Sequence, residues 1–352
     1  MKPGVPVCVL GAGAWGTALA VHAASRGETV LLARDAELLA QLRRRGENTR
    51  YLPGIELPQG LRFEESTVAA LRHAGGGGLV VLAVPVAALR GLARSLRDAW
   101  ARGEAQAPAA LLILAKGFEQ GTAALPHQVV AEELQGLSRA PAVGMLSGPS
   151  FAQEVARGLP VALVAAGAPA LSRCAVHALH GGAMRVYASD DLAGVAVGGA
   201  VKNVLAIACG VSDGLQQGAN ARAALITRGL AEMARLGHAL GARHETFMGL
   251  SGMGDLVLTC TGELSRNRRV GLQLAAGKDL QAVVRDLGHV AEGVYTARTV
   301  LELARSQGLQ MPITEQVCAL LERRTDAAGA LEALLAREPR TESEAPESGD
   351  AP

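Results

Sequence analysis

The sequence predicts an α/β domain built on a doubly wound parallel sheet, followed by an all-α domain. Up to about residue 150, short apolar runs alternate with helical stretches, which is typical of strands covered by helices on both faces. After about residue 190, apolar residues such as Ile226, Leu230 and Met233 recur at helical spacing, and strand signals vanish. Because the 352 residues exceed one ordinary core of roughly 100–150, we expect domains at residues 1–190 and 191–338.

Five runs rich in Val, Ile and Leu are the expected strands of the first domain. They cover residues 5–10, 29–33, 79–84, 110–115 and 142–146. Ligands of parallel sheets bind beyond the carboxyl ends of the strands. The residues that follow the runs are therefore the first candidates for a binding site: Gly11, Arg34, Pro85, Lys116 and Gly148.

A G-x-G-x-x-G motif, from Gly11 through Gly13 to Gly16, directly follows the first expected strand and opens a helix. In this context the glycines allow a tight turn, close approach of a pyrophosphate and close packing of helix on strand, while the helix N-terminus attracts phosphate. The motif therefore predicts a dinucleotide-binding domain of the Rossmann type.

The end of the second expected strand bears on the choice of cofactor. An acid there binds the ribose 2′-hydroxyl of NAD, whereas an arginine suits the 2′-phosphate of NADP. The sequence has Arg34 followed by Asp35. Arg34 favours NADP(H), but Asp35 could pair with Arg34 or bind the hydroxyl in its place. We therefore expect NADP(H) and/or NAD(H).

Lysine is scarce in this chain, and two of the four lysines follow apolar residues. Lys116 ends an expected strand, and Lys202 lies at the middle of the apolar run 192–211. This run is long enough for a membrane span, but a central lysine and several glycines disfavour insertion. We expect a buried helix instead, on which Lys202 gives a proton to the oxygen of a carbonyl that accepts hydride.

A third group of candidates lies between residues 252 and 269. A glycine turn presents Asp255, whose carboxylate we expect to hold a lysine or a substrate hydroxyl. The segment Leu264–Arg269 follows at an expected helix start. Its Ser265, Arg266 and Asn267 suit a phosphate, although a solvated basic turn is an equal alternative.

Composition excludes several other classes. Lys plus Arg number 34 against 33 Asp plus Glu, so no strong positive field attracts nucleic acid. The five cysteines are scattered without a C-x-x-C pair, which disfavours a disulfide framework or a zinc site and favours a reducing cytoplasm. We expect no metal. Residues 339–352 have almost no apolar side chains, which predicts a disordered acidic tail.

Taken together, these motifs resemble those of the bacterial NAD(P)-dependent glycerol-3-phosphate dehydrogenases. The resemblance covers about residues 5–321 and one departure is clear, since members often have Ser or Thr where this chain has Ala14. The matching stretches are GAGAWGTALA, NTRYLPGIELP, LAKGFEQGT, LSGPSFAQEVARGLP, GAVKNVLAIACGVSDGL, GLSGMGDLVLTCTGELSRNRRVG, VAEGVYTA and MPITEQV.

The resemblance implies reversible interconversion of dihydroxyacetone phosphate and sn-glycerol 3-phosphate, supplying glycerophospholipid synthesis. It implies a C-terminal domain like that of 6-phosphogluconate dehydrogenase, with Lys202 as the proton donor and acceptor. The cofactor-binding residues that we expect are Gly11, Gly13, Ala14, Trp15, Gly16, Arg34, Asp35, Lys116, Ala152, Arg266 and Glu292. The expected substrate-binding residues are Lys116, Gly148, Ser150, Lys202, Asp255, Ser265, Arg266 and Asn267.

Two alternatives stay open on the sequence alone. The first is a β-hydroxyacid or 6-phosphogluconate-type dehydrogenase, although a K-x-x-N is expected there and Lys202 and Asn203 are adjacent here. The second is a redox sensor that binds NADP(H) without turnover. The sequence also leaves open the oligomeric state, a homodimer included, feedback regulation and the role of the tail.

Overall fold

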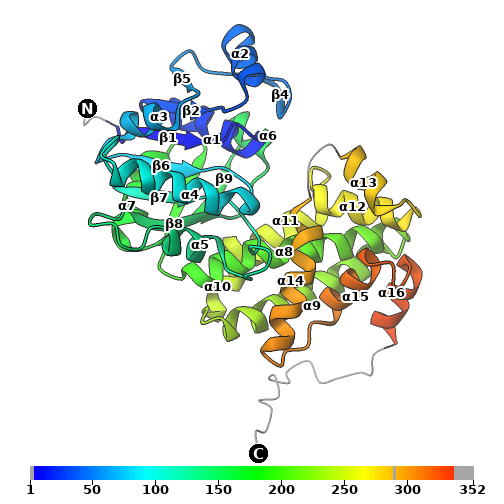
Figure 1. Cartoon of the computed structure of the whole chain (residues 1–352). Helices are drawn as coiled ribbons and strands as arrows, with labels where there is room; N and C mark the ends of the chain where they lie inside the picture. The colour runs from blue at the N-terminus through cyan, green and yellow to red at the C-terminus, as the bar shows by residue number, and fades with distance from the viewer. Residues whose placement is uncertain (1–3, 288–290, 337–352) are drawn as a thin grey trace, which may run out of the picture. The chain divides into compact units, whose positions relative to one another are not determined.

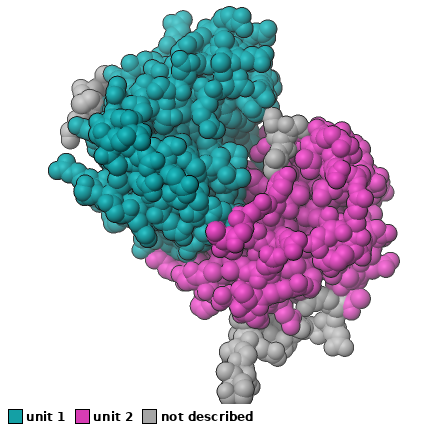
Figure 2. Space-filling view, in the orientation of Figure 1, with its two compact units in different colours: residues 1–119, 124–196 teal, residues 120–123, 197–352 magenta. Residues whose placement is uncertain are grey.

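The computed structural model describes residues 4–287 and 291–336, so the tail expected at 339–352 lies outside the described residues. The chain divides into two compact units (Figure 2). Unit 1 comprises Met1–Glu119 and Ala124–Ala196, and unit 2 comprises Gln120–Ala123 and Val197–Pro352. The proposed domain boundary at residue 190 falls in the link between the last strand, which ends at Ser189, and the long helix that begins at Leu192.

Unit 1 contains an eight-stranded sheet with the order β10-β9-β8-β7-β6-β1-β2-β5. The five expected runs form β1, β2, β6, β7 and β8, which are parallel to one another where they pair, so the predicted α/β class is confirmed. The strand bounds are β1 Val7–Leu10, β2 Thr29–Leu32, β5 Leu61–Glu64, β6 Leu79–Leu82, β7 Ala110–Ile113, β8 Ala142–Ser147, β9 Val161–Gly167 and β10 Met184–Ser189, with a separate pair β3 Glu47–Asn48 and β4 Leu52–Glu56.

One side of the sheet adds strands that are not all parallel to their neighbours. Strand β9 pairs antiparallel with β8, and β10 runs parallel to β9. The helix between β8 and β9, α6 (Ala152–Ala156), packs against α1 (Ala14–Ala24) instead of crossing the sheet. Strand β9 therefore begins on the side of the sheet where β8 ends.

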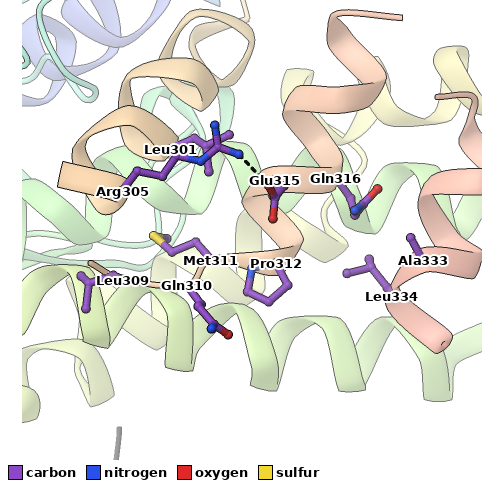
Figure 3. A pocket seen from close by; sticks show the side chains of 10 residues that line it. All are labelled: Leu301, Arg305, Leu309, Gln310, Met311, Pro312, Glu315, Gln316, Ala333 and Leu334. Atoms are coloured by element: carbon purple, nitrogen blue, oxygen red, sulfur yellow. Dashed lines mark hydrogen bonds and ion pairs between the residues drawn. The ribbon is translucent and has the colours of Figure 1, made fainter. Parts of the chain in front are cut away.

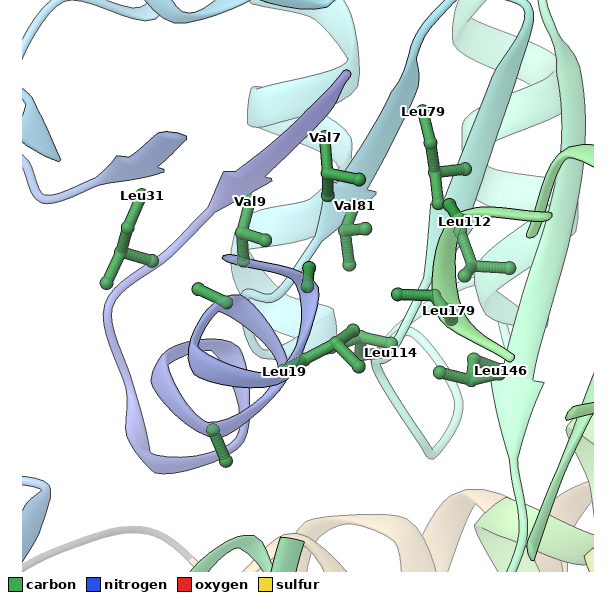
Figure 4. Packing of buried hydrophobic residues seen from close by; sticks show 14 of the residues in the cluster. Val7, Val9, Leu19, Leu31, Leu79, Val81, Leu112, Leu114, Leu146 and Leu179 are labelled. Atoms are coloured by element: carbon green, nitrogen blue, oxygen red, sulfur yellow. The ribbon is translucent and has the colours of Figure 1, made fainter. Parts of the chain in front are cut away.

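Helices cover both faces of this sheet (Figure 1). Helix α1 and α7 (Pro169–Leu179) pack on the face that carries Val9 and Val81, where Leu19 and Leu179 meet the strands (Figure 4). Every residue of β1 is buried, as expected of a central strand. The remaining helices of unit 1 are α2 Ala36–Arg45, α3 Thr67–Ala74, α4 Val86–Ala101 and α5 Pro126–Glu133.

The order of the strands reverses next to β1. The chain runs from β1 to β2 and β5 on one side, and then returns to β6 on the other side of β1. Such a switch point is where open α/β sheets bind ligands. The carboxyl ends of the parallel strands are followed by Gly11, Arg34, Lys116 and Gly148. These residues therefore lie on the side of the sheet where the parallel strands end, which is the side that binds ligands.

The described residues of unit 2 form helices joined by turns, and none of them belongs to a strand. Its longest helix, α8 (Leu192–Gly214), is apolar and long enough to span a membrane, but 89% of its apolar window is buried inside the protein. The prediction of a buried helix is therefore confirmed. The other elements are α9 Gly218–Ala239, α10 His244–Met248, η1 Leu250–Gly254, α11 Asp255–Thr261, α12 Arg266–Ala275, α13 Leu280–Asp286, α14 Glu292–Ser306, α15 Pro312–Leu321 and α16 Ala327–Leu335.

Candidate active site

The glycine loop of unit 1 has the shape that a dinucleotide needs. A Cβ on Gly11 would lie 2.4 Å from the carbonyl oxygen of Ala83, and a Cβ on Gly16 would lie 2.1 Å from that of Gly11. Those two glycines serve internal packing. A Cβ on Gly13 would meet no atom within 4 Å, so the space beside Gly13 is open. The first turn of α1 points its backbone N–H groups toward this space, which fits a pyrophosphate.

Ala14 and Trp15 form the start of α1, as the motif predicts. Gly13 caps this helix without a side-chain hydrogen bond, so the first-turn N–H groups are not satisfied by a cap. Trp15 is half-buried and packs against the core of unit 1. Ala152, at the start of α6, also packs against this core. Helix α6 packs on α1, the helix that begins at the glycine loop.

The two charged residues after β2 have different environments. Arg34 is exposed and has no ion pair among the described residues. Asp35 is the N-cap of α2, where its Oδ1 accepts a hydrogen bond of 3.0 Å from the N–H of Leu38. Its Oδ2 pairs with Nη1 of Arg50 at 3.0 Å, and not with Arg34. Hydrogen bonds from Leu38 and Glu37 and the charge of Arg50 lower the pKa of the Asp35 carboxyl.

Asn48, a residue that the sequence reasoning missed, joins this region to the glycine loop. Its side chain is fully buried, and its Nδ2 donates to the carbonyl of Ala12 at 2.9 Å and to Oγ1 of Thr17 at 2.8 Å. Its Oδ1 accepts from the N–H of Tyr51 at 3.2 Å. Asn48 therefore fixes the segment that carries Arg50 against the cofactor loop.

The other strand ends of unit 1 carry the expected substrate residues. Lys116 is half-buried and follows the buried residues Leu114 and Ala115. Gly148 has a φ of +132°, a backbone conformation that favours glycine. Ser150 donates a hydrogen bond of 3.0 Å from Oγ to the carbonyl of Gly148, which closes the turn after β8.

In unit 2, Lys202 lies in a buried cluster of three side chains. Its residue is 7% exposed, and its Nζ donates to Oδ1 of Asp255 at 2.6 Å and to Oγ1 of Thr259 at 2.9 Å. Thr259 donates its own proton to the carbonyl of Asp255 at 2.6 Å, so its oxygen accepts from Lys202. The expectation that Asp255 holds a lysine is confirmed. Thr259 follows Asp255 by one helical turn, a spacing that could have predicted it.

A chain of hydrogen bonds runs beside this cluster. The N–H of Gly293 donates to Oδ1 of Asn267 at 3.0 Å, and Nδ2 of Asn267 donates to Oδ1 of Asn203 at 2.9 Å. Nδ2 of Asn203 in turn lies 3.4 Å from Oε2 of Glu292. These bonds bring together Asn203 of α8, Asn267 of α12 and Glu292 of α14. The side-chain N–H of Asn203 faces the carboxylate of Glu292.

Glycines set the spacing of the helices that carry these side chains. A Cβ on Gly210 of α8 would lie 2.0 Å from the carbonyl oxygen of Arg268, and a Cβ on Gly271 of α12 would lie 2.1 Å from that of Ile207. The glycine turn expected before Asp255 is a π-helical turn, η1, in which a Cβ on Gly252 would lie 2.2 Å from the carbonyl oxygen of Phe247. Backbone contact therefore positions both α12 and α11.

The basic segment after α11 divides into separate tasks. Ser265 is the N-cap of α12, since its Oγ accepts from the N–H of Arg268 at 3.2 Å. The guanidinium of Arg268 pairs with the half-buried Asp213 at 2.7 Å. Arg266 is exposed and has no ion pair among the described residues. The cluster is therefore partly structural, and Arg266 is an exposed cation at the first position of α12.

A separate pocket in unit 2 lies among α14, α15 and α16 (Figure 3). Its volume is about 370 Å³, and its lining includes Met311, Leu334 and an ion pair of 2.6 Å between Arg305 and Glu315. None of the residues predicted for the cofactor or the substrate lines this pocket.

A glycine loop at the switch point of a parallel sheet, followed in the chain by a helical unit with a buried lysine and carboxylate, is typical of nicotinamide-dependent dehydrogenases. Comparison with known families agrees with this class. Residues 6–171 match the model of the NAD-dependent glycerol-3-phosphate dehydrogenase N-terminus, and residues 191–332 match that of its C-terminus. The chain belongs to this family, and it is an oxidoreductase that uses NAD(H) or NADP(H).

Individual relatives support the same assignment. The chain is 57% identical over 338 residues to a glycerol-3-phosphate dehydrogenase [NAD(P)+] of Burkholderia orbicola, with 96% of this chain and 99% of the relative covered. The crystal structure of a glycerol-3-phosphate dehydrogenase from Coxiella burnetii is 39% identical and covers 95% of this chain and 99% of its own, with a TM-score of 0.87. That of Saccharomyces cerevisiae is 26% identical, with coverages of 95% and 99% and a TM-score of 0.79.

The family decides between the alternatives that the sequence left open. A D-mandelate dehydrogenase, 12% identical with a TM-score of 0.58, shares the fold alone. The chain is therefore placed with the glycerol-3-phosphate dehydrogenases and not with the hydroxyacid enzymes, and it is an enzyme and not a sensor.

Proposed function

We propose that this protein reduces dihydroxyacetone phosphate reversibly to sn-glycerol 3-phosphate with NAD(P)H, and that Lys202 is its general acid and base. The observation that carries the proposal is the buried contact of Nζ of Lys202 with Oδ1 of Asp255, at 2.6 Å. A buried ammonium that is held by a carboxylate and a hydroxyl has few orientations, so its proton is directed. The relatives are glycerol-3-phosphate dehydrogenases, and this activity supplies the substrate class of the proposal.

The chemistry follows from these groups. When bound, the nicotinamide supplies hydride to the carbonyl carbon in one direction and accepts it from the alcohol in the other. As the carbonyl oxygen gains negative charge, Nζ of Lys202 donates a proton to it and yields the alcohol. In reverse, Nζ accepts the hydroxyl proton. Asp255 keeps the lysine in place and neutralises its charge in the ammonium form.

We propose contacts in each unit for the two ligands. Gly11, Gly13, Ala14, Trp15, Gly16, Arg34 and Ala152 of unit 1 contact the cofactor, as do Arg266 and Glu292 of unit 2, and Asp35 shapes its ribose site. Lys116 contacts both ligands. Gly148 and Ser150 of unit 1, and Lys202, Asp255, Ser265, Arg266 and Asn267 of unit 2, hold the substrate, with Arg266 on the phosphate.

A substrate panel tests the proposal. We expect NADPH oxidation with dihydroxyacetone phosphate and none with keto acid carboxylates that lack a phosphate. Turnover of a carboxylate substrate in preference to the phosphorylated ketone would contradict it. The proposed place of the reaction is the cytoplasm, and the proposed use of its product is the synthesis of glycerophospholipids.

A further inference from the structure

Asp35 differs from the acid that usually follows the second strand of a dinucleotide-binding domain. An acid at the end of the second strand usually binds the ribose 2′-hydroxyl and repels a 2′-phosphate. Here both of its oxygens are occupied, Oδ1 by the N–H of Leu38 and Oδ2 by Nη1 of Arg50, each at 3.0 Å. The carboxylate is therefore a helix cap that is neutralised by an arginine from another segment.

Arg50 is held in this place by more than its ion pair. Its guanidinium carbon lies 5.2 Å from the centre of the Tyr51 ring, which restricts its plane. The buried Asn48 ties the same segment to Ala12 and Thr17 of the glycine loop. Gln41 of α2 also bonds Thr49, the residue between Asn48 and Arg50. The arginine is thus fixed relative to both α2 and the cofactor loop, and not only by a surface contact.

Arg50 keeps donors for a second anion. A guanidinium has five N–H groups, and Asp35 accepts from one nitrogen only. Among residues 4–287 and 291–336, no other hydrogen bond or ion pair of Arg50 is formed, and its side chain is 53% exposed. Arg34, one residue before Asp35, is exposed as well. Two cations therefore flank one neutralised carboxylate at the end of β2.

We propose that Arg50 determines the cofactor specificity of this protein: it neutralises Asp35 and, together with Arg34, binds the 2′-phosphate of NADP(H). The inference rests on the proposed cofactor site at the glycine loop. Without Arg50, the carboxylate of Asp35 repels the 2′-phosphate and is released to accept a bond from a 2′-hydroxyl. The arginine thus converts an acid that is typical of NAD sites into part of an NADP site.

Binding of two adenosine fragments, measured by calorimetry on the whole chain, tests this inference without turnover. The fragments are 2′,5′-ADP, which carries the 2′-phosphate, and 5′-ADP, which lacks it. We expect Arg50→Ala to weaken the binding of 2′,5′-ADP about 10- to 100-fold, because one or two charge-assisted hydrogen bonds are lost. The affinity for 5′-ADP should stay within about twofold. Arg45→Ala, at the far end of α2, is the matched control and should change neither affinity.

A second variant separates the charge effect from the lost contact. Adding Asp35→Asn to Arg50→Ala should restore part of the affinity for 2′,5′-ADP, because asparagine still caps α2 but carries no charge. Equal weakening of both fragments by Arg50→Ala would mean that the arginine only holds the segment, and would overturn the inference while the proposed function stands. A wild-type chain that binds neither fragment would overturn the proposed cofactor site as well.

Discussion

Nζ of Lys202 lies 2.6 Å from Oδ1 of Asp255, and the two side chains are 9% and 1% exposed. Such a pair is costly to break on one side only, because the remaining charge stays buried without its partner. The contact joins α8 to α11, so it bears both on the stability of unit 2 and on the position of the Lys202 amine. Its two members therefore give different predictions.

Removal of the carboxylate should cost both stability and activity. We expect Asp255→Ala to lower the free energy of unfolding by about 3–5 kcal/mol, since it leaves the ammonium of Lys202 unpaired in a buried place. Asp255→Asn keeps the shape and a hydrogen-bond acceptor, so its loss of stability should be smaller. Urea unfolding of both variants measures the difference. An Asp255→Ala variant as stable as the wild type would show that water reaches this pair freely.

Removal of the amine should lower kcat, and it should also lower stability, because the carboxylate of Asp255 is 1% exposed and loses the ammonium beside it. We expect Lys202→Ala to lower kcat about 10²- to 10⁴-fold, the usual contribution of a positioned general acid. The affinity for NADPH, measured by fluorescence titration, should be unchanged. Lys278→Ala is the matched control, because Lys278 is an exposed lysine that pairs with Asp286. A Lys202→Ala variant with wild-type kcat would show that Lys202 does not transfer the proton.

Two glycines of one loop should respond oppositely to the same substitution. Gly13 has open space around its Cβ position and a φ of −72°, so Gly13→Ala should fold normally but bind the dinucleotide poorly. In Gly16→Ala the new Cβ would lie 2.1 Å from the carbonyl oxygen of Gly11, so the protein itself should be destabilised. Thermal unfolding and NADPH binding, measured on both variants, separate the effects. Tight NADPH binding by a folded Gly13→Ala variant would place the pyrophosphate elsewhere.

The substrate phosphate gives a prediction for α12. Arg266 is exposed at the first position of this helix, and Arg269 is exposed one turn later. We expect Arg266→Ala to raise the KM for dihydroxyacetone phosphate about 10- to 100-fold, because a phosphate loses a bidentate partner. Arg269→Ala should leave this KM within about twofold. Equal effects of the two variants would indicate general attraction of the anion and no specific contact.

A buried carboxylate in unit 2 should make stability depend on pH. Glu232 of α9 is 2% exposed and accepts from the N–H of Ile313 at 2.6 Å, at the start of α15. Desolvation raises its pKa, with the hydrogen bonds opposing this effect. The folded state therefore holds the proton to a higher pH than the unfolded state, and the stabilisation by the protonated form is lost as pH rises from about 4.3 through the raised pKa.

The pH series compares the wild type with Glu232→Gln. We expect the free energy of unfolding of the wild type, minus that of the glutamine variant, to fall as pH rises through this window. The variant itself should be less stable overall, because an amide nitrogen cannot accept the hydrogen bond of 3.2 Å that Oε2 accepts from Thr314. A constant or rising difference would contradict the direction of the pKa shift.

The central strands were predictable from the sequence because strands that are buried on both faces consist of apolar residues. The run at β1 is apolar throughout and is followed by glycines, and both features were readable without a partner. Strand β10 was not among the expected strands, since only Met184 and Val186 of its six residues are buried. Its direction and that of β9 depend on where the chain crosses the sheet, which no local pattern records.

The candidate site divides in the same way. Lys202 and Asp255 were predicted from an unusual charge in an apolar helix and from a carboxylate after glycines. Thr259 and Asn48 were missed, because their importance comes from what lies opposite them, 57 and 31 residues away in the chain. For Asp35, the sequence offered pairing with its neighbour Arg34 as one of two possibilities, but the structure pairs it with Arg50, 15 residues away in the chain.

Gly210 lies against the carbonyl of Arg268, and Gly271 lies against the carbonyl of Ile207, and these two contacts limit how this protein can diversify. Contacts with backbone peptide groups set the distance between α8 and α12, and no substitution changes the size of a peptide group. New substrate preferences selected in the laboratory should therefore arise from side chains that project from these helices, such as Asn203 and Arg266. Libraries that vary the two glycines should return mostly unfolded protein.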